Sequence, residues 1–210
     1  MLLKKEREQI AIYGRKLLAS NLTKGTGGNI SIFNPEKKLV AISPSGIDYH
    51  KIMAEDVVVL DLEGKKVEGK HQPSSESNMH CFFYQNRADI KSVVHTHSIF
   101  SSTLATLGWE LPATNYLIAV AGRKIKCAPY ARFGTQQLAK LAYQACQQSR
   151  ACFLANHGML AIGGSLPEAF MIAEMIEHCA EIHYRAKLVG TPVELTTEQL
   201  DELVAAIGVY

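Results

Sequence analysis

The chain has 210 residues, of which 47% are hydrophobic and 20% are charged, and its formal net charge is +2. This length suits one compact domain, and these fractions are close to those of ordinary globular proteins and exclude a disordered chain. The small charge, with Lys and Arg scattered among Asp and Glu, excludes the broad basic surface that binds nucleic acid.

The N-terminal sequence and the cysteines indicate where in the cell the protein is expected to be. The N-terminal sequence MLLKKEREQI carries charges where a signal peptide has its apolar core, and no stretch approaches the roughly 20 apolar residues that span a bilayer. The five cysteines form no CxxC pair, and an odd number without such pairs is typical of a reducing compartment, where cysteines act as small core residues. We therefore expect a cytoplasmic protein with neither nucleic acid nor a membrane as a partner.

The first third of the chain predicts one helix followed by short strands. Apolar residues at helical spacing among charges indicate a surface helix from Lys4 to about Ser20. Apolar runs bounded by Gly, Pro, Ser or charged residues then predict strands over 29–33, 39–42 and 57–60.

The remainder mixes helices and strands. A helix capped by Ser74 or Ser75 is expected to run to about Gln85, and the apolar segment 92–96 predicts a buried strand. Further helices are expected over 98–107, after Thr135, after the capping pattern Ser165-Leu-Pro-Glu168 to about 188, and over 196–207. No Pro/Ser-rich linker interrupts this order, which favours a single α/β domain over residues 1–210.

Two histidines stand two residues apart on the strand predicted at 92–96. His95 and His97 therefore project from one face and can grip one metal ion. A third histidine, His157, directly follows the apolar run 152–155, which as a buried strand would deliver it to the edge of a cleft. Three protein ligands leave a position open for substrate, as catalytic zinc sites do. For the His-x-His pair alone, two strand histidines satisfied by neighbours remain an alternative.

A carboxylate lies near these histidines in the predicted helix. Glu76 and His80 are four residues apart, so they share a helix face and either can point at the same ion. We prefer Glu76 because it stands at the helix start, where the preceding loop can aim it inward. His80 is expected to be a buried core histidine with satisfied hydrogen bonds.

Three Gly- and Ser-rich turns precede the histidines. Gly25-Thr26-Gly27-Gly28-Asn29 supplies consecutive backbone N–H groups beside a hydroxyl and an amide, which is typical of an anion-binding nest. Ile30 stands where a dinucleotide fingerprint needs glycine. Ser43-Pro44-Ser45-Gly46 and Ser74-Ser75 add hydroxyls and the N-terminal amides of a helix. Each segment is also an ordinary turn or cap, but together they predict a site for a small phosphorylated substrate.

In chain order, GTGGN, SPSG, PSSE, HTH and NHG resemble the motifs of the class II aldolase family, and the resemblance runs nearly end to end. Segments 113–119 and 128–135 are similar to members of the family that act on L-fuculose 1-phosphate. The resemblance implies a three-layer α/β/α sandwich around a mixed, largely antiparallel sheet. It also implies a cyclic homotetramer with active sites at the subunit interfaces.

The resemblance assigns the site residues as well. It implies one Zn²⁺ per subunit, held by His95, His97, His157 and Glu76. It places the substrate phosphate at seven positions, which are Thr26, Gly27, Asn29, Ser43, Gly46, Ser74 and Ser75. Tyr116 is implied to act across a subunit interface. Tyr210, near the C-terminus, is implied to help close the site over the aldehyde portion of the substrate.

The implied reaction cleaves L-fuculose 1-phosphate, or a close ketose 1-phosphate, to dihydroxyacetone phosphate and L-lactaldehyde. Zinc would stabilise the enediolate as a Lewis acid, and Glu76, displaced from the metal, would protonate it. Tyr116 would exchange a proton with the C4 hydroxyl. For this role we expect burial to raise the pKa of Glu76.

Other functions fit parts of the pattern. The same fold and metal would serve a pentulose-5-phosphate 4-epimerase or a methylthioribulose-1-phosphate dehydratase. A non-catalytic interaction module like the adducin head shares the fold, but loss of the histidine ligands is its distinguishing feature. Three histidines and a glutamate could also activate water in a zinc hydrolase, although no amide or ester pocket is recognisable.

Overall fold

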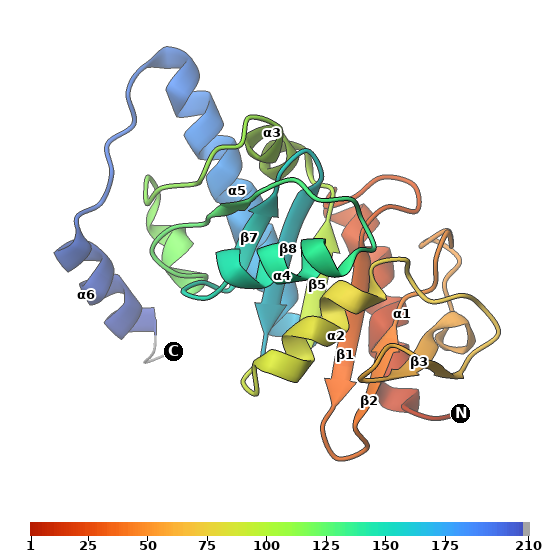
Figure 1. Cartoon of the computed structure of the whole chain (residues 1–210). Coiled ribbons are helices and arrows are strands. Elements are labelled where there is room, and N and C mark those ends of the chain that lie inside the picture. The colour runs from red at the N-terminus through yellow and green to blue at the C-terminus, as the bar shows by residue number, and fades with distance from the viewer. Residues whose placement is uncertain (208–210) are drawn as a thin grey trace.

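The computed structural model describes residues 1–207, which build one open sheet with helices on both faces (Figure 1). Its eight strands are arranged in the order β4-β3-β2-β1-β5-β8-β7-β6. The strands are β1 (Asn29–Asn34), β2 (Leu39–Ile42), β3 (Val58–Asp61), β4 (Lys66–Glu68), β5 (Ser92–Thr96), β6 (Cys127–Ala128), β7 (Ala151–Leu154) and β8 (Gly158–Gly163). The pair β6–β7 is parallel and the other neighbours are antiparallel, so the sheet is mixed and largely antiparallel.

The central strands are apolar on both faces because helices cover both faces. In β5, Val93 packs into one core and Val94 into the other, and in β8 Leu160 and Ala161 divide in the same way. Successive side chains of a strand point to opposite faces, so a continuous apolar run serves two cores at once.

Six α-helices and two short 3₁₀ helices complete the described residues. They are α1 (Lys4–Ala19), η1 (Ala54–Asp56), α2 (Ser77–Asn86), α3 (Ile99–Thr106), η2 (Tyr116–Val120), α4 (Gln136–Ala145), α5 (Leu166–Val189) and α6 (Thr197–Ile207). Apolar side chains of α1, α3 and α5 enter one core, and those of α2 and α4 enter the other. The two sets of helices lie on opposite faces of the sheet (Figure 1). The expected three-layer α/β/α sandwich is therefore confirmed.

Some boundaries differ from the sequence-based expectation. The helix expected to be capped by Ser74 or Ser75 begins at Ser77, after Glu76, because Ser74 Oγ accepts a hydrogen bond from the Glu76 N–H and closes a turn before the helix. The short strands β4 and β6 and the Gly-flanked β8 were not expected. A strand of two or three residues carries too little periodicity to be recognised, and the flanking glycines of β8 resemble turn residues.

The cysteines match the expectation of small core residues in most positions. All five are free, four are buried, and Cys127 is partly exposed. Within residues 1–207, no helix combines the length and apolar character needed to cross a membrane.

Candidate metal and phosphate site

The histidine cluster is built where β5 meets the turn between β7 and β8. Strand alternation places His95 on the same face of the sheet as Val93, beneath α2 and α4, and His97 follows one residue after the strand ends. Asn156 takes a positive φ of 55° in the β7–β8 turn, and His157 follows it beside the pairing partner of β5. Glu76 reaches the same point from the start of α2.

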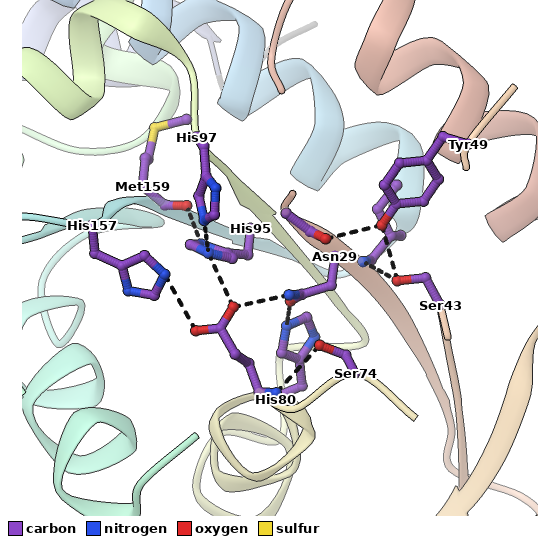
Figure 2. Close-up of polar contacts among 12 residues, drawn as sticks. Asn29, Ser43, Tyr49, Ser74, His80, His95, His97, His157 and Met159 are labelled. Carbon is purple, nitrogen blue, oxygen red and sulfur yellow. Dashed lines mark hydrogen bonds and ion pairs between the residues drawn. The ribbon is translucent and has the colours of Figure 1, made fainter. Parts of the chain in front are cut away.

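These four side chains converge, as Figure 2 shows for His95, His97 and His157. One ligand atom from each lies within 4.8 Å of the others. The Glu76 carboxylate lies 3.2 Å from His95 Nε2 and 3.5 Å from His157 Nε2. The Nε2 atoms of His95 and His97 are 2.9 Å apart. The structure thus brings together the four residues that the sequence placed at one metal.

Contacts behind the cluster fix how its members point. His95 Nδ1 donates to the carbonyl oxygen of Met159 at 2.9 Å, which leaves His95 Nε2 facing the cluster. Asn29 Nδ2 donates to Glu76 Oε2 at 3.0 Å. Glu76 Oε1 is buried and has no hydrogen-bond donor among the described residues.

The charge states of the cluster follow from burial and mutual proximity. Burial and the neighbouring His95 lower the pKa of His157 to about 4, and the same causes, with His157 itself, lower the pKa of His97 to about 4. Burial alone would raise the pKa of Glu76, as we expected. The charges of His95 and His157 and the hydrogen bonds from His95 and Asn29 outweigh burial, so the pKa of Glu76 lies far below its ordinary value.

The donor set fits a divalent metal ion. Three imidazole nitrogens and one carboxylate form a combination that zinc accepts, and an ion among them would give the unpartnered Glu76 Oε1 a partner. It would also separate the two facing imidazole nitrogens of His95 and His97, which otherwise compete for one proton.

The three Gly- and Ser-rich segments meet beside this cluster. They line a cleft of about 340 Å³ together with Glu76, His97 and His157. Six of the seven residues expected at the phosphate line this cleft, namely Thr26, Gly27, Asn29, Gly46, Ser74 and Ser75. The three Gly- and Ser-rich segments therefore form one polar wall of the cleft.

Ser43 is the exception among the seven. It is fully buried, and its Oγ accepts hydrogen bonds from the Ile30 N–H at 3.1 Å and from the Tyr49 hydroxyl at 3.2 Å (Figure 2). Its hydroxyl is therefore committed to holding the second turn against β1. Asn29 lines the cleft, but its amide is occupied by Glu76 and His80.

Glycines let the loops approach the histidines closely. A Cβ on Gly27 would lie 2.8 Å from His97 Nδ1, and a Cβ on Gly158 would lie 3.0 Å from His97 Cδ2 and 2.3 Å from the Thr96 carbonyl oxygen. Any larger residue at either position would displace the loop or the imidazole. The glycines thus serve the metal cluster as well as the turn.

Phe133 is a cleft residue that sequence reasoning did not single out. It lines the cleft although 57% of its surface is exposed, and Gly134 allows its loop to pack on the backbone of Ser75. The Phe133-Gly134 pair gives a weak signal, because exposed aromatics also occur singly on ordinary surfaces.

The two tyrosines assigned by resemblance lie elsewhere. Tyr116 is the first residue of η2, is 57% exposed, and does not line the cleft of its own chain. Tyr210 lies outside the described residues.

Comparison with known proteins gives consistent matches. Residues 8–184 match the family described as class II aldolase and adducin N-terminal domain. The chain is 53% identical to 5-deoxy-D-ribulose 1-phosphate aldolase of Bacillus thuringiensis serovar kurstaki, over 100% of this chain and 99% of that protein. It is 36% identical to L-fuculose phosphate aldolase of Escherichia coli K12, over 85% and 82% of the two chains. A solved structure described as L-fuculose 1-phosphate aldolase matches with TM-score 0.95 and 45% identity, over 97% and 96%.

Proposed function

The chain belongs to the class II aldolase family, as its motifs predicted, and from this premise we propose that it cleaves a terminally deoxygenated ketose 1-phosphate. The products are dihydroxyacetone phosphate and a short aldehyde. The first candidate substrate is 5-deoxyribulose 1-phosphate, because the relative named 5-deoxy-D-ribulose 1-phosphate aldolase is 53% identical over 99% of its length. L-Fuculose 1-phosphate, our expectation from the motifs, is the second candidate, supported by the solved structure of that name at 45% identity.

One observation carries the proposal. A single cleft contains Gly- and Ser-rich loops suited to a phosphate and, next to them, the carboxylate and imidazoles of the candidate metal cluster. In a ketose 1-phosphate the phosphorus is three bonds from the carbonyl carbon, so both groups can be bound in a cleft of about 340 Å³. A plain anion-binding nest would not need metal ligands beside it, and an isolated metal site would not need Gly- and Ser-rich loops beside it.

The residues divide the chemistry between the two ends of the substrate. Backbone amides of the first loop and the Ser74 and Ser75 hydroxyls hold the phosphate. Zinc, when bound, supplies a Lewis acid that draws electron density from the ketose carbonyl. Glu76, whose pKa is low, first takes up a proton from solvent and then passes it to C3, where the C3–C4 electron pair is left.

The proton balance requires a second group. Cleavage removes a proton from the C4 hydroxyl, which becomes the aldehyde oxygen, and adds one to C3. We propose that Tyr116 of a neighbouring subunit takes the proton of the C4 hydroxyl while passing its own phenolic proton to solvent, since Tyr116 is exposed and lies outside the cleft of its own chain. The homotetramer with shared active sites and the closing role of Tyr210 belong to the same proposal.

The alternative functions would use the same site but would differ in the products they release. An epimerase would change the configuration at C4 without releasing an aldehyde, and a dehydratase would release water and keep the carbon chain intact. An adducin-like module would bind without turnover. The presence of all four candidate ligands at the cluster argues against a module that has lost them.

The test is a cleavage assay on both sugars with product identification. Native, chelator-treated and zinc-restored protein is incubated with each ketose 1-phosphate, and dihydroxyacetone phosphate and the aldehyde are measured separately. We expect acetaldehyde from 5-deoxyribulose 1-phosphate, lost on chelation and restored by zinc. Faster release of L-lactaldehyde from L-fuculose 1-phosphate would select the second substrate. Product without carbon–carbon cleavage would refute the aldolase proposal.

A further inference from the structure

A continuous chain of hydrogen bonds runs from the cleft into the core between the sheet and α2. It begins at Glu76 Oε2, which accepts from Asn29 Nδ2 at 3.0 Å. Asn29 Oδ1 lies 2.5 Å from His80 Nε2, and His80 Nδ1 lies 2.7 Å from Ser31 Oγ. Ser31 Oγ lies 2.5 Å from the Tyr84 hydroxyl. Figure 2 shows Asn29 and His80 side by side below the cluster.

Every donor and acceptor in this chain is determined by the carboxylate at its end. An ionised carboxylate only accepts, so Asn29 must turn its NH₂ group toward Glu76 and its carbonyl oxygen toward His80. That oxygen accepts, so His80 Nε2 must carry the proton and Nδ1 must be the acceptor. Ser31 then donates to His80 and accepts from Tyr84.

Burial keeps His80 in this state. His80 is fully buried, and removal from water favours the neutral form of an imidazole. A neutral imidazole has one donor and one acceptor nitrogen, and the chain uses both. This agrees with the expectation that His80 is a satisfied core histidine, but its partners connect it to the cleft.

We propose that His80 is a positioning residue that fixes the amide of Asn29 and, through it, holds the carboxylate of Glu76 at the histidine cluster. The catalytic consequence rests on the proposed function, whereas the effect on metal affinity does not. Without His80, the amide of Asn29 is free to rotate, and a reversed amide presents its oxygen to the carboxylate. Glu76 would then lose a hydrogen bond and gain a repulsive contact.

Two variants of nearly equal chemistry separate this role from a general effect on stability. In His80→Gln the side-chain amide reaches about as far as Nε2 and can still donate to Asn29. In His80→Asn it reaches only about as far as Nδ1, so it can bond to Ser31 but leaves Asn29 Oδ1 without a donor. Each variant buries one amide and loses one of the two original contacts, so their effects on thermal stability are expected to be similar.

The first readout is zinc affinity, measured by competition with a chromophoric chelator. Contacts that orient a metal ligand from behind typically change metal affinity about 10–100-fold when removed. We expect His80→Asn to weaken zinc binding at least about tenfold and His80→Gln to stay within about threefold of the unaltered protein. Equal zinc affinity in the two variants would overturn the proposal.

The second readout is the steady-state kinetics of cleavage. We expect His80→Asn, loaded with zinc, to lose kcat while KM changes little, because the phosphate loops are untouched. If the unaltered protein binds zinc but cleaves neither sugar, the proposed function fails while the affinity comparison still decides the role of His80.

A measurement on the unaltered protein covers the case in which neither variant folds. In ¹⁵N-histidine-labelled protein, the ring of His80 should appear as the Nε2–H tautomer with a slowly exchanging proton. The Nδ1–H tautomer would mean that Asn29 donates to His80 and turns its oxygen toward Glu76, which would contradict the proposal.

Discussion

At the scale of single residues, the behaviour of Glu76 is set by its neighbours more than by its burial. Its carboxylate is buried, yet the two histidines and Asn29 keep its pKa low. The pKa values of His97 and His157 are about 4, so these two imidazoles are neutral near neutral pH and their nitrogens can bind a metal. Burial lowers the pKa of His95, but the adjacent Glu76 carboxylate outweighs burial and raises it above its ordinary value. A carboxylate that binds a metal and also transfers a proton needs both burial, which favours its neutral form, and neighbouring positive charge, which favours its ionised form.

Gly28 is a residue whose substitution tests how tightly the first loop packs on the cluster. Its φ is 68°, and a Cβ there would lie 2.6 Å from the His95 carbonyl oxygen. Gly25 has a φ of 62° but nothing within 4 Å, so it is a matched control. We expect Gly25→Ala to cost about 1–2 kcal/mol from the left-handed backbone alone. Gly28→Ala should cost about 1–3 kcal/mol more from crowding.

Urea unfolding of the metal-free protein measures both costs, and zinc affinity should fall only in Gly28→Ala because only that change displaces His95. Equal unfolding free energies for the two variants would show that the loop is loosely packed and that the close approach has no energetic consequence.

The residues at the cluster could be predicted from sequence, but the contacts behind them could not. The His-x-His spacing, His157 after an apolar run and Glu76 at a helix start are local patterns. The burial of Ser43, and the link from Asn29 to His80, depend on pairing between β1, β2 and β5 and on α2 packing above them. The Asn29–His80 contact joins residues 51 positions apart, and no local pattern encodes it.

At the scale of elements, the connection that carries His97 is anchored by a helix from the far end of the chain. Glu177 of α5 accepts hydrogen bonds from Ser98 Oγ, Phe100 N–H and Ser101 N–H at 2.7–2.8 Å. These are the free donors at the start of α3, and a negative charge is favourable there. Glu177 thus does what an N-cap side chain normally does, from another helix.

Replacing Glu177 with Gln should lower the free energy of unfolding by about 1–2 kcal/mol. Three donors share the two oxygens of the Glu177 carboxylate, and Gln keeps only one of these oxygens and has no charge. Glu181→Gln, one turn later on α5, breaks only a partly exposed pair with Arg185 and should cost about 0.5 kcal/mol or less. Urea unfolding measures the free energy of unfolding that each variant loses. Similar losses would show that Glu177 does not anchor the start of α3.

The longer elements were predictable because their patterns repeat over several turns or are bounded by clear signals. The helices α1, α4 and α5 start within one residue of their expected positions, and at α4 and α5 the capping residues Thr135 and Ser165 make the expected hydrogen bonds. The pairing order of the strands was not predictable, since β5 joins β1 and β8 across long sequence separations. The sheet order is a property of tertiary packing, whereas a cap is a property of three or four residues.

At the scale of the whole molecule, the cleft is incomplete within one chain for the proposed reaction. Tyr116 is exposed on η2 and does not line the cleft, so its proposed role requires a second subunit. A cyclic assembly with shared sites satisfies this requirement because each chain can lend Tyr116 to its neighbour.

Mixed oligomers test that arrangement. Glu76→Gln and Tyr116→Phe chains carrying different tags are co-expressed, and oligomers containing both are isolated. Each variant alone should be nearly inactive, but in random equal mixtures about a quarter of the sites combine a native Glu76 with a native Tyr116 from the neighbour. About that fraction of native activity should return. If the mixed oligomers are no more active than oligomers of Glu76→Gln chains alone, the proposal that subunits share active sites is contradicted.

The most direct test of the central claim is hydrogen exchange into dihydroxyacetone phosphate in D₂O without any aldehyde. This half-reaction does not depend on which sugar is the substrate, and NMR follows it at the hydroxymethyl carbon. We expect the zinc-loaded protein to exchange one of the two hydrogens, and we expect no exchange by chelator-treated protein or by Glu76→Gln. No exchange by zinc-loaded protein, or equal exchange by Glu76→Gln, would contradict the assignment of this cleft and of Glu76.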